Sequence, residues 1–300
     1  MNPVAVYFAS GESLYLGVLL LVVVIVVSPF LKKTWSARLR NVGAWIGLTM
    51  IVMACPPFPL GMYLTFVVVF LFWFIASNRT EATRTWMKVR HVSTGLLVVL
   101  LLVLAVVEFS HRRMPVIVGE PSDHLVVIGD SISSGIDPHI PAWPVVLQQI
   151  SRVSVTNLAK PGAQVSEALS MARQLTPDDH IVLIEIGGND LLMGVSSEEF
   201  KQHLDALLSK VTAPGRTVAM FELPLLPHKI AYGRIQRRLA TKYRISLIPK
   251  RYLAGVISGA NATSDGLHLS ATGSRRMAAL VAEVLSSVLK SAPGQRTNPL

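Results

Sequence analysis

Four long apolar runs in the first 109 residues constrain the fold of this chain more than any other feature. We predict one membrane-spanning helix in each of them, at residues 14–31, 42–55, 60–76 and 92–109. The first run holds twelve Leu, Ile or Val residues between Leu14 and Val27. At roughly 0.3–0.6 kcal/mol each, these side chains favour membrane insertion by about 5 kcal/mol. A Pro-rich stretch between the second and third runs predicts the tight turn of a helical hairpin, so residues 1–113 are predicted to form a transmembrane region.

The basic residues of this region indicate its orientation. Residues 32–41 and residues 77–91 carry four Lys or Arg each, whereas the N-terminus and the Pro-rich turn carry none. The positive-inside rule then places both basic loops in the cytoplasm and both chain ends outside. The first run has no preceding Lys or Arg, and no small-residue cleavage site follows it before Lys32. We therefore expect a retained helix and not a cleaved signal peptide.

Charge and composition exclude several classes of function. Residues 1–113 hold ten Lys or Arg against three acids, a net charge of +7 out of +10 for the chain, so the basic character lies mostly in the membrane region and gives little support to nucleic-acid binding. The predicted spans contain few ionisable groups: Glu108 lies at a span end, and nothing charged lies in mid-membrane. Transporters usually need such groups in mid-membrane, so we expect a simple anchor. The single cysteine, Cys55, excludes a disulfide framework, and no histidine spacing suits a metal, so neither a metal nor a cofactor is expected.

From residue 123 onward, short β-branched runs alternate with helical stretches. The predicted strands are 124–130, 152–157, 180–186, 217–222 and 245–248. The predicted helices are 142–151, 165–174, 197–211, 229–243 and 271–289. This alternation predicts an α/β fold with a five-stranded parallel sheet that helices cover on both faces. Residues 114–122 are predicted to be a linker, 123–290 the soluble domain and 291–300 a flexible tail.

Polar residues and glycines gather where the predicted strands end, which is where parallel sheets place their active residues. Ser131 follows the first strand through Gly129 and Asp130. A nucleophilic serine needs a base, and the base needs an orienting carboxylate. Asp265 and His268, three residues apart and just before the last predicted helix, supply both groups.

An acyl-transfer site also needs preorganised donors for the oxyanion. The candidates are the backbone N–H groups of Ser131 and Gly162 and the side-chain amide of Asn189. Each motif alone has a simpler interpretation, because Gly-Asp-Ser often marks a turn and Asn189-Asp190 could cap a helix. Together, in this order and each beside a predicted strand or helix, they indicate a hydrolase site.

At these residues the chain resembles the SGNH, or GDSL-type, hydrolase family, in a layout closest to its lysophospholipase/thioesterase I/arylesterase branch. The resemblance covers about residues 123–290, through Gly129-Asp130-Ser131-Ile132, Asn157…Gly162, Gly187-Gly188-Asn189-Asp190 and Asp265-Gly266-Leu267-His268. Ile132 stands where the family usually has leucine, and Leu269 where proline is common.

The resemblance implies a flavodoxin-like three-layer α/β/α domain. It implies Ser131 as the nucleophile, His268 as general base and then acid, and Asp265 as the partner that orients His268. The implied oxyanion hole consists of Ser131, Gly162 and Asn189. Supporting roles fall to Gly129, Asp130, Gly188 and Asp190.

We therefore expect a membrane-anchored serine esterase that hydrolyses lipid or lysophospholipid acyl esters, or thioesters, through an acyl-enzyme. One alternative is an O-acetylesterase or acyltransferase that acts on cell-envelope glycans, because these reactions share the acyl-enzyme. A second is a non-catalytic binding or scaffold protein on the same fold. The expected location is a bacterial inner membrane with the catalytic domain outside the cytoplasm, and the expected partners are an acyl-ester substrate and membrane lipid.

The stretch from Lys229 to Arg251 stands apart because it carries eight basic residues and no acid. An ordinary solvated helix face is the simplest explanation. The alternative hypothesis is a face that meets anionic lipid headgroups or an anionic substrate, where each basic residue contributes about 1 kcal/mol.

Overall fold

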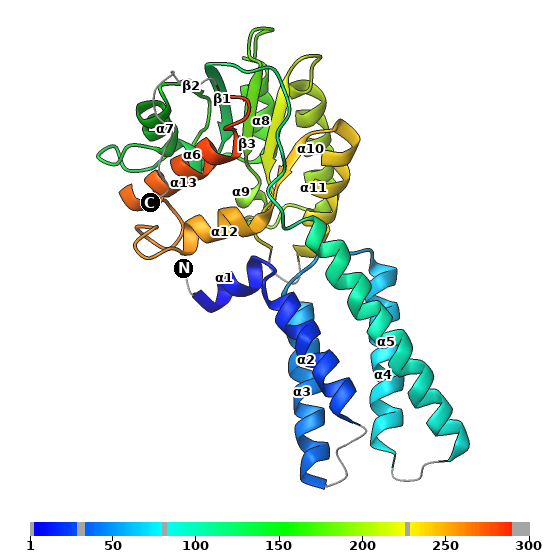
Figure 1. Ribbon diagram of the computed structural model, residues 1–300. Coiled ribbons are helices and arrows are strands. Elements are labelled where there is room, and N and C mark those ends of the chain that lie inside the picture. Colours follow the sequence, from blue (N-terminus) through cyan, green and yellow to red (C-terminus); the bar gives the residue numbers. More distant parts are fainter. Residues whose placement is uncertain (1–2, 29–33, 80–82, 226–228, 290–300) are drawn as a thin grey trace. The chain divides into compact units, whose positions relative to one another are not determined.

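The computed structural model describes residues 3–28, 34–79, 83–225 and 229–289 (Figure 1). The chain divides into two compact units. One is helical and contains the described residues between 7 and 113, and the other is an α/β unit whose main part contains residues 114–224 and 231–289.

The described N-terminal region is helical. Its helices are α1 (Pro3–Ala9), α2 (Ser13–Val27), α3 (Thr34–Met53), α4 (Leu60–Asn78) and α5 (Arg84–Ser110). Helices α4 and α5 are long and apolar enough to cross a membrane, and α2 is a shorter apolar helix. Helix α3 begins at Thr34 and not at residue 42, so it includes Arg38 and Arg40 of the predicted basic loop. Residues 29–31 of the first predicted span, and Lys32 and Lys33 of that loop, lie outside the described residues.

Glycine allows α2 and α3 to approach closely. A Cβ added at Gly17 would lie 2.8 Å from the carbonyl oxygen of Gly47, and one added at Gly47 would lie 2.7 Å from Leu21 Cγ. Small residues of this kind let helices pack where lipid supplies no hydrophobic driving force between them. Polar contacts join α3 to α4. Arg40 of α3 donates to the Ser77 carbonyl at 2.9 Å and to Asn78 Oδ1 at 2.6 Å.

The α/β unit contains a five-stranded parallel sheet in the order β2-β1-β3-β4-β5. The strands are β1 (His124–Gly129), β2 (Ser154–Asn157), β3 (Ile181–Glu185), β4 (Thr217–Phe221) and β5 (Ser246–Ile248). All five predicted strands are thus confirmed, with edges moved by one or two residues. Arg152, which was predicted to begin the second strand, has φ +59° and ends helix α7 instead.

Helices cover both faces of this sheet (Figure 1), as the sequence predicts. Helices α7 (Trp143–Ser151), α12 (Lys250–Ser258) and α13 (Ala271–Val284) cover one face, where Trp143, Leu253 and Met277 share a core with Val127 and Leu183 of the sheet. Helices α8 (Val165–Ala172), α10 (Ser197–Val211) and α11 (Ile230–Tyr243) cover the other. Strands buried on both faces are expected to be apolar throughout, and every residue of β3 and β4 is buried.

Three helices of the α/β unit were not predicted from the sequence: α6 (Ser131–Ser134), α9 (Gly188–Leu192) and α12. The last predicted helix is also shorter than expected, because α13 ends at Val284 and not at residue 289. The predicted linker packs on this unit. Ile117 is buried, its carbonyl accepts from Ser287 Oγ at 2.6 Å, and Ser122 N–H donates to the Val288 carbonyl at 2.8 Å. The predicted tail, residues 291–300, lies outside the described residues.

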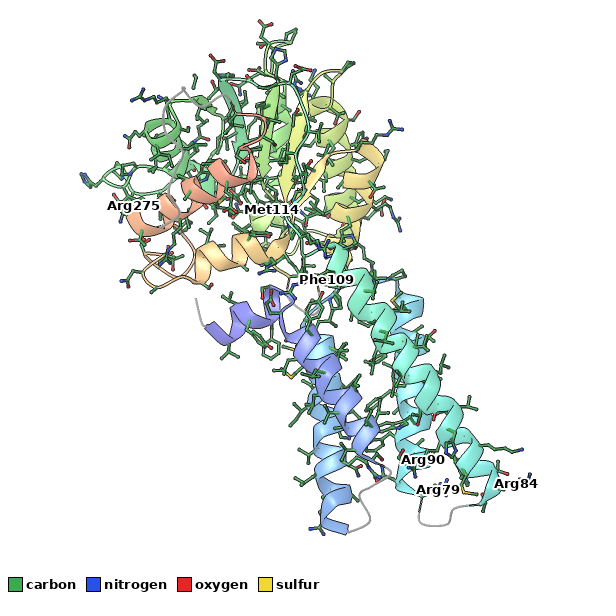
Figure 2. The ribbon with its side chains drawn as sticks, viewed as in Figure 1. Arg79, Arg84, Arg90, Phe109, Met114 and Arg275 are labelled. Atoms are coloured by element: carbon green, nitrogen blue, oxygen red, sulfur yellow. The ribbon has the colours of Figure 1, made fainter. Side chains whose placement is uncertain are left out.

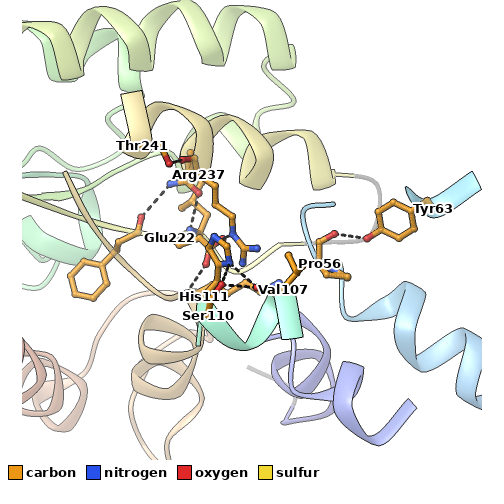
Figure 3. Close-up of polar contacts among 12 residues, drawn as sticks. Pro56, Tyr63, Val107, Ser110, His111, Glu222, Arg237 and Thr241 are labelled. Atoms are coloured by element: carbon orange, nitrogen blue, oxygen red, sulfur yellow. Dashed lines mark hydrogen bonds and ion pairs between the residues drawn. The ribbon is translucent and has the colours of Figure 1, made fainter. Parts of the chain in front are cut away.

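Intramolecular ion pairs neutralise part of the basic stretch around α11. Arg237 donates to the buried carboxylate of Glu222 at 2.6 Å (Figure 3), and Lys242 donates to Asp205 at 2.6 Å. These pairs give Arg237 and Lys242 a role inside the fold. For these two residues, an ordinary solvated helix face is therefore a sufficient explanation.

Candidate active site

Two groups of predicted site residues, 129–131 and 188–190, lie at the carboxyl ends of β1 and β3. These two strands are neighbours in the sheet, yet the chain leaves β1 toward β2 on one side and leaves β3 toward β4 on the other. A strand order that reverses in this way opens a crevice at the carboxyl ends, where ligands of open α/β sheets bind. Ser131 follows β1 at this point, and Asn189 follows β3.

The turn that carries Ser131 is tightly built. A Cβ added at Gly129 would lie 2.8 Å from the Glu185 carbonyl oxygen and 2.8 Å from Ser133 Oγ, so the position admits only glycine without a local shift. The next residue, Asp130, caps α6 by accepting the N–H of Ile132 on Oδ1 at 3.0 Å. Ser131 is then the first residue of α6, with 7% of its surface exposed.

Asp265 and His268 form a hydrogen-bonded pair on the loop before α13. His268 Nδ1 lies 2.6 Å from Asp265 Oδ2, while Asp265 Oδ1 accepts the N–H groups of Leu267 at 2.9 Å and His268 at 2.8 Å. These bonds, led by the one from the imidazole, hold the pKa of Asp265 well below its usual range. The carboxylate therefore stays ionised and fixes the imidazole with Nδ1 occupied and Nε2 available.

The loop that holds this pair is itself anchored. Thr263 and Leu269 form an antiparallel bridge across it, and Ser264 N–H donates to the His268 carbonyl at 3.0 Å. At the start of α13, a Cβ added at Gly273 would lie 2.0 Å from the Ala262 carbonyl oxygen. Close packing at Gly273 therefore seats the helix directly against the loop.

The loop of His268 and the nucleophile turn share one core, because Leu269, the residue after His268, packs against the cluster that contains Ile132, the residue after Ser131. Within the described residues, however, the Ser131 hydroxyl makes no hydrogen bond, to His268 or to any other group. Hydrogen bonds of catalytic groups are often long in the absence of substrate and tighten in the complex.

The three predicted oxyanion donors lie close together, because Asn189 contacts Ala163, the neighbour of Gly162, and Asp130, the neighbour of Ser131. In the described part of the chain, the N–H groups of Ser131 and Gly162 have no hydrogen-bond acceptor. Gly162 has φ +74°, a backbone conformation that favours glycine, and its surroundings are open. Asn189 Nδ2 carries two hydrogens. One donates to the Ala163 carbonyl at 2.9 Å, and the other makes only a long contact of 3.4 Å to Asp130 Oδ2.

Asp190 and Gly188 have structural positions beside these donors. Asp190 is fully buried, and its Oδ2 accepts the N–H of Val165 at 3.0 Å, which joins α9 to the start of α8. Burial raises the pKa of this carboxyl group above its usual value. A Cβ added at Gly188 would lie 3.4 Å from Asp130 Oδ2, which is ordinary contact.

Sequence reasoning missed a buried polar network behind the nucleophile. Ser133 Oγ donates to Glu185 Oε2 at 2.8 Å and accepts from Trp143 Nε1 at 3.2 Å. Asn157 Nδ2 donates to the Ser133 carbonyl at 2.9 Å. One signal of this network was present in the sequence, since Glu185 is a lone acid that ends the otherwise apolar strand β3.

Metal ligands are not clustered in the described part of the chain, where no group of three His, Cys, Asp or Glu side chains could hold an ion. The chemistry that the arrangement supports is nucleophilic attack by a serine assisted by an Asp–His pair.

Comparison with known proteins extends this picture. The model of the GDSL-like Lipase/Acylhydrolase family matches residues 127–276, a stretch that lies within the region of the α/β unit. A Vibrio mimicus protein named "Arylesterase" is 30% identical, over 55% of this chain and 90% of its own length. "Thioesterase 1/protease 1/lysophospholipase L1" of Escherichia coli strain K12 is 28% identical, over 43% of this chain and 66% of its own. A solved structure described as "Crystal Structure of TesA" is 28% identical with a TM-score of 0.49, and the similarity covers 55% of this chain and 99% of that one.

Proposed function

The chain belongs to the GDSL-like lipase/acylhydrolase family and is an ester hydrolase, and on that premise we propose a membrane-anchored serine esterase that works through an acyl-enzyme. One observation carries this proposal more than any other. His268 is held by Asp265 through Nδ1 at 2.6 Å, and the next residue, Leu269, packs against the core that contains Ile132 of the Ser131 helix. A histidine whose Nδ1 is held by a carboxylate, and whose Nε2 is left to accept a proton, is the arrangement that activates a serine.

In the proposed first step, Ser131 Oγ attacks the carbonyl carbon of the ester while His268 Nε2 takes the hydroxyl proton. The carbonyl oxygen becomes the oxyanion, which accepts from Ser131 N–H, Gly162 N–H and the Asn189 Nδ2 hydrogen that otherwise makes only the long contact to Asp130. Because two of these donors have no other acceptor in the described chain, they are available without rearrangement. Protonated His268 then donates its proton to the leaving alcohol or thiol as the bond to the acyl group breaks.

The second half of the reaction repeats these roles with water. His268 Nε2 takes a proton from a water molecule, which attacks the carbonyl carbon of the acyl-serine. The same three donors hold the second oxyanion, and His268 returns the proton to Ser131 as the acid leaves. Asp265 remains a carboxylate throughout, because its three hydrogen bonds keep its pKa low.

We propose an apolar acyl group, as in lipid esters or thioesters, as the substrate. The names of the relatives, an arylesterase and a thioesterase/lysophospholipase, support this choice. Exposed apolar side chains also lie close in sequence to the proposed catalytic residues. Leu192 and Met193 come shortly after Asn189, and Leu267 comes directly before His268. An O-acetylated glycan would offer these side chains little apolar surface.

We also propose that residues 1–113 anchor the enzyme, with four spans and both chain ends outside the cytoplasm. The charge distribution supports this orientation. Figure 2 shows Arg79, Arg84 and Arg90 together at one end of the α4–α5 hairpin, and Phe109 at the opposite end. At that opposite end, Arg112 and Arg113 are two basic residues against the eight of the two basic loops, and the positive-inside rule follows the larger number.

The test is a hydrolysis panel with the full-length protein in detergent, comparing acetyl, medium and long-chain esters and thioesters. We expect wild type to prefer the longer acyl chains and Ser131→Ala to lose activity on every substrate. Ser134→Ala is the matched control, because this hydroxyl lies on the same short helix and donates only to the Gly135 carbonyl. Preference for acetyl esters would favour the glycan alternative, and a folded wild type without activity on any ester would overturn the proposal.

A further inference from the structure

Two carboxyl groups are buried together directly behind the candidate nucleophile. Asp130 is 3% exposed and Glu185 is 2% exposed, and they lie at the ends of neighbouring strands, where the Asp130 N–H donates to the Glu185 carbonyl at 3.2 Å. Two ionised carboxylates buried at such neighbouring positions repel each other and offer only acceptor atoms, so a proton held by one of them and donated to the other in a hydrogen bond relieves the conflict. The mechanism above does not use either group.

The surroundings decide which group carries the proton. Asp130 accepts the N–H of Ile132 at 3.0 Å and lies 3.4 Å from an amide hydrogen donor on Asn189, so donors stabilise a negative charge on it. Burial, followed by the nearby Asp130, raises the pKa of Glu185 well above its usual value, whereas burial raises the pKa of Asp130 to about 6. Near neutral pH, Asp130 is therefore the carboxylate and Glu185 the acid that donates to it.

This pair is tied to both sides of Ser131. On one side, Asp130 shapes the turn through its bond to the N–H of Ile132. On the other, Ser133 donates to Glu185 Oε2 at 2.8 Å and is held in turn by Trp143. Ser131 lies between these two anchored residues in the chain, so the pair fixes the segment that presents both its hydroxyl and its N–H.

We propose, on the premise of the esterase function above, that Glu185 is a positioning residue: protonated, it donates to Asp130 and accepts from Ser133, and so holds the turn that presents Ser131. The role requires a group that donates and accepts at the same time. Glutamine can do both in the same shape, whereas leucine can do neither.

The charged groups around the pair set its response to pH. His268, from the loop before α13, favours the charged form of Asp130, and Asp190, from α9, disfavours it. Glu185 itself faces Asp130 and the hydroxyl of Ser133. Loss of the shared proton would place two negative charges in a site that water does not reach, which is unfavourable.

The sign of the effect on stability follows from the raised pKa of Glu185. In the unfolded chain Glu185 releases its proton near the usual carboxyl range, about 4.3, while the folded protein keeps it to higher pH. The stability of the folded state therefore falls as pH rises through this window. A Glu185→Gln variant cannot lose the proton, so it should gain stability relative to wild type as pH increases.

The experiment compares full-length wild type, Glu185→Gln and Glu185→Leu in detergent, from about pH 5 to about pH 9, by thermal unfolding midpoint and by kcat and KM. We expect the midpoint of Glu185→Gln to rise relative to wild type as pH increases, and its loss of activity on the alkaline side to move to higher pH. We expect Glu185→Leu to lose about 10- to 100-fold in kcat with little change in KM, and Glu185→Gln to recover most of that loss.

Two results would overturn the inference while the enzyme is active: equal kcat for the leucine and glutamine variants, or pH profiles of midpoint and activity that run parallel in wild type and Glu185→Gln. If the leucine variant does not fold, the comparison of wild type with Glu185→Gln still decides. Absence of hydrolysis by folded wild type would instead overturn the proposed function on which the inference rests.

Discussion

Two regions around His268 use the same functional group under opposite conditions. On the exposed loop before α13, 48% of the Asp265 side chain is exposed, and three hydrogen bonds hold its pKa low. In the buried region behind Ser131, Asp130 and Glu185 have little solvent, and burial raises both of their pKa values. The comparison teaches that the number of donors and the access of water, and not the residue type, decide whether a carboxyl group is a permanent charge or holds a proton.

The largest expected effect lies on the exposed side of this comparison. Asp265→Asn keeps the shape but no longer accepts from His268 Nδ1–H in the same way, so the imidazole loses its fixed tautomer. We expect kcat to fall by about 10³- to 10⁴-fold, measured on the preferred ester. Asp205→Asn is the control, because Asp205 is also an exposed, hydrogen-bonded aspartate, paired with Lys242, and should change kcat very little. A loss of less than about tenfold in Asp265→Asn would remove Asp265 from the proposed mechanism.

The second-largest expected effect concerns Asn189, whose side-chain amide is a proposed oxyanion donor. Asn189 donates to the Ala163 carbonyl and keeps a second hydrogen only loosely engaged with Asp130. Asn189→Ala should lower kcat by about 10²- to 10³-fold, because one oxyanion donor is lost in the transition state. Gln202→Ala, on the exposed side of α10, controls for loss of a side-chain amide. An Asn189→Ala enzyme with normal kcat would mean that the oxyanion is held elsewhere.

The third effect concerns the packing of the buried region. Gly129→Ala would bring a methyl group within 2.8 Å of the Glu185 carbonyl oxygen and of Ser133, so the turn must shift. We expect the free energy of unfolding to fall by about 1–3 kcal/mol, measured by denaturant unfolding. Gly255→Ala in α12 has open space around its Cβ and should instead raise the free energy of unfolding by about 0.5–1 kcal/mol. Equal effects at the two positions would contradict the close packing assigned to Gly129.

The smallest effect is the difference in pH dependence between the two regions. Because the folded-state pKa of Asp265 is lowered, its contribution to stability is present above the usual carboxyl range and is lost as pH falls. The unfolding midpoint of wild type should therefore exceed that of Asp265→Asn most near neutral pH and approach it on acidification. The unfolding midpoint of wild type relative to Glu185→Gln should change in the opposite way, and fall as pH rises. If both midpoint differences changed with pH in the same direction, the pKa values of Asp265 and Glu185 would not be shifted in opposite directions.

Much of the fold could be predicted from the sequence, because its signals are local. Helix α10 was predicted with its observed bounds, and its start is marked by a capping box between Ser196 and Glu199. The strands were recognisable as short apolar runs that end in glycine and polar residues. Helix α12 was missed because it begins with Lys250 and Arg251 directly after a short strand, and its buried face consists of only a few apolar residues.

The candidate site could be predicted only where its residues form sequence motifs. Ser131, Gly162, Asn189, Asp265 and His268 lie in such motifs. The network of Ser133, Trp143 and Glu185 does not, because its members are distant in sequence and meet only through the packing of β1, β3 and α7. The proton held by Asp130 and Glu185 depends on burial, which no local pattern of residues specifies.

Covalent capture shows directly whether Ser131 is the nucleophile of this ester hydrolase. Full-length protein in detergent is treated with a fluorophosphonate, digested, and analysed by peptide mass spectrometry. We expect one phosphonylated peptide with the adduct on Ser131, lost in Ser131→Ala and retained in Ser134→Ala. An adduct on another residue, or folded wild-type protein that hydrolyses esters without modification of Ser131, would contradict this role of Ser131.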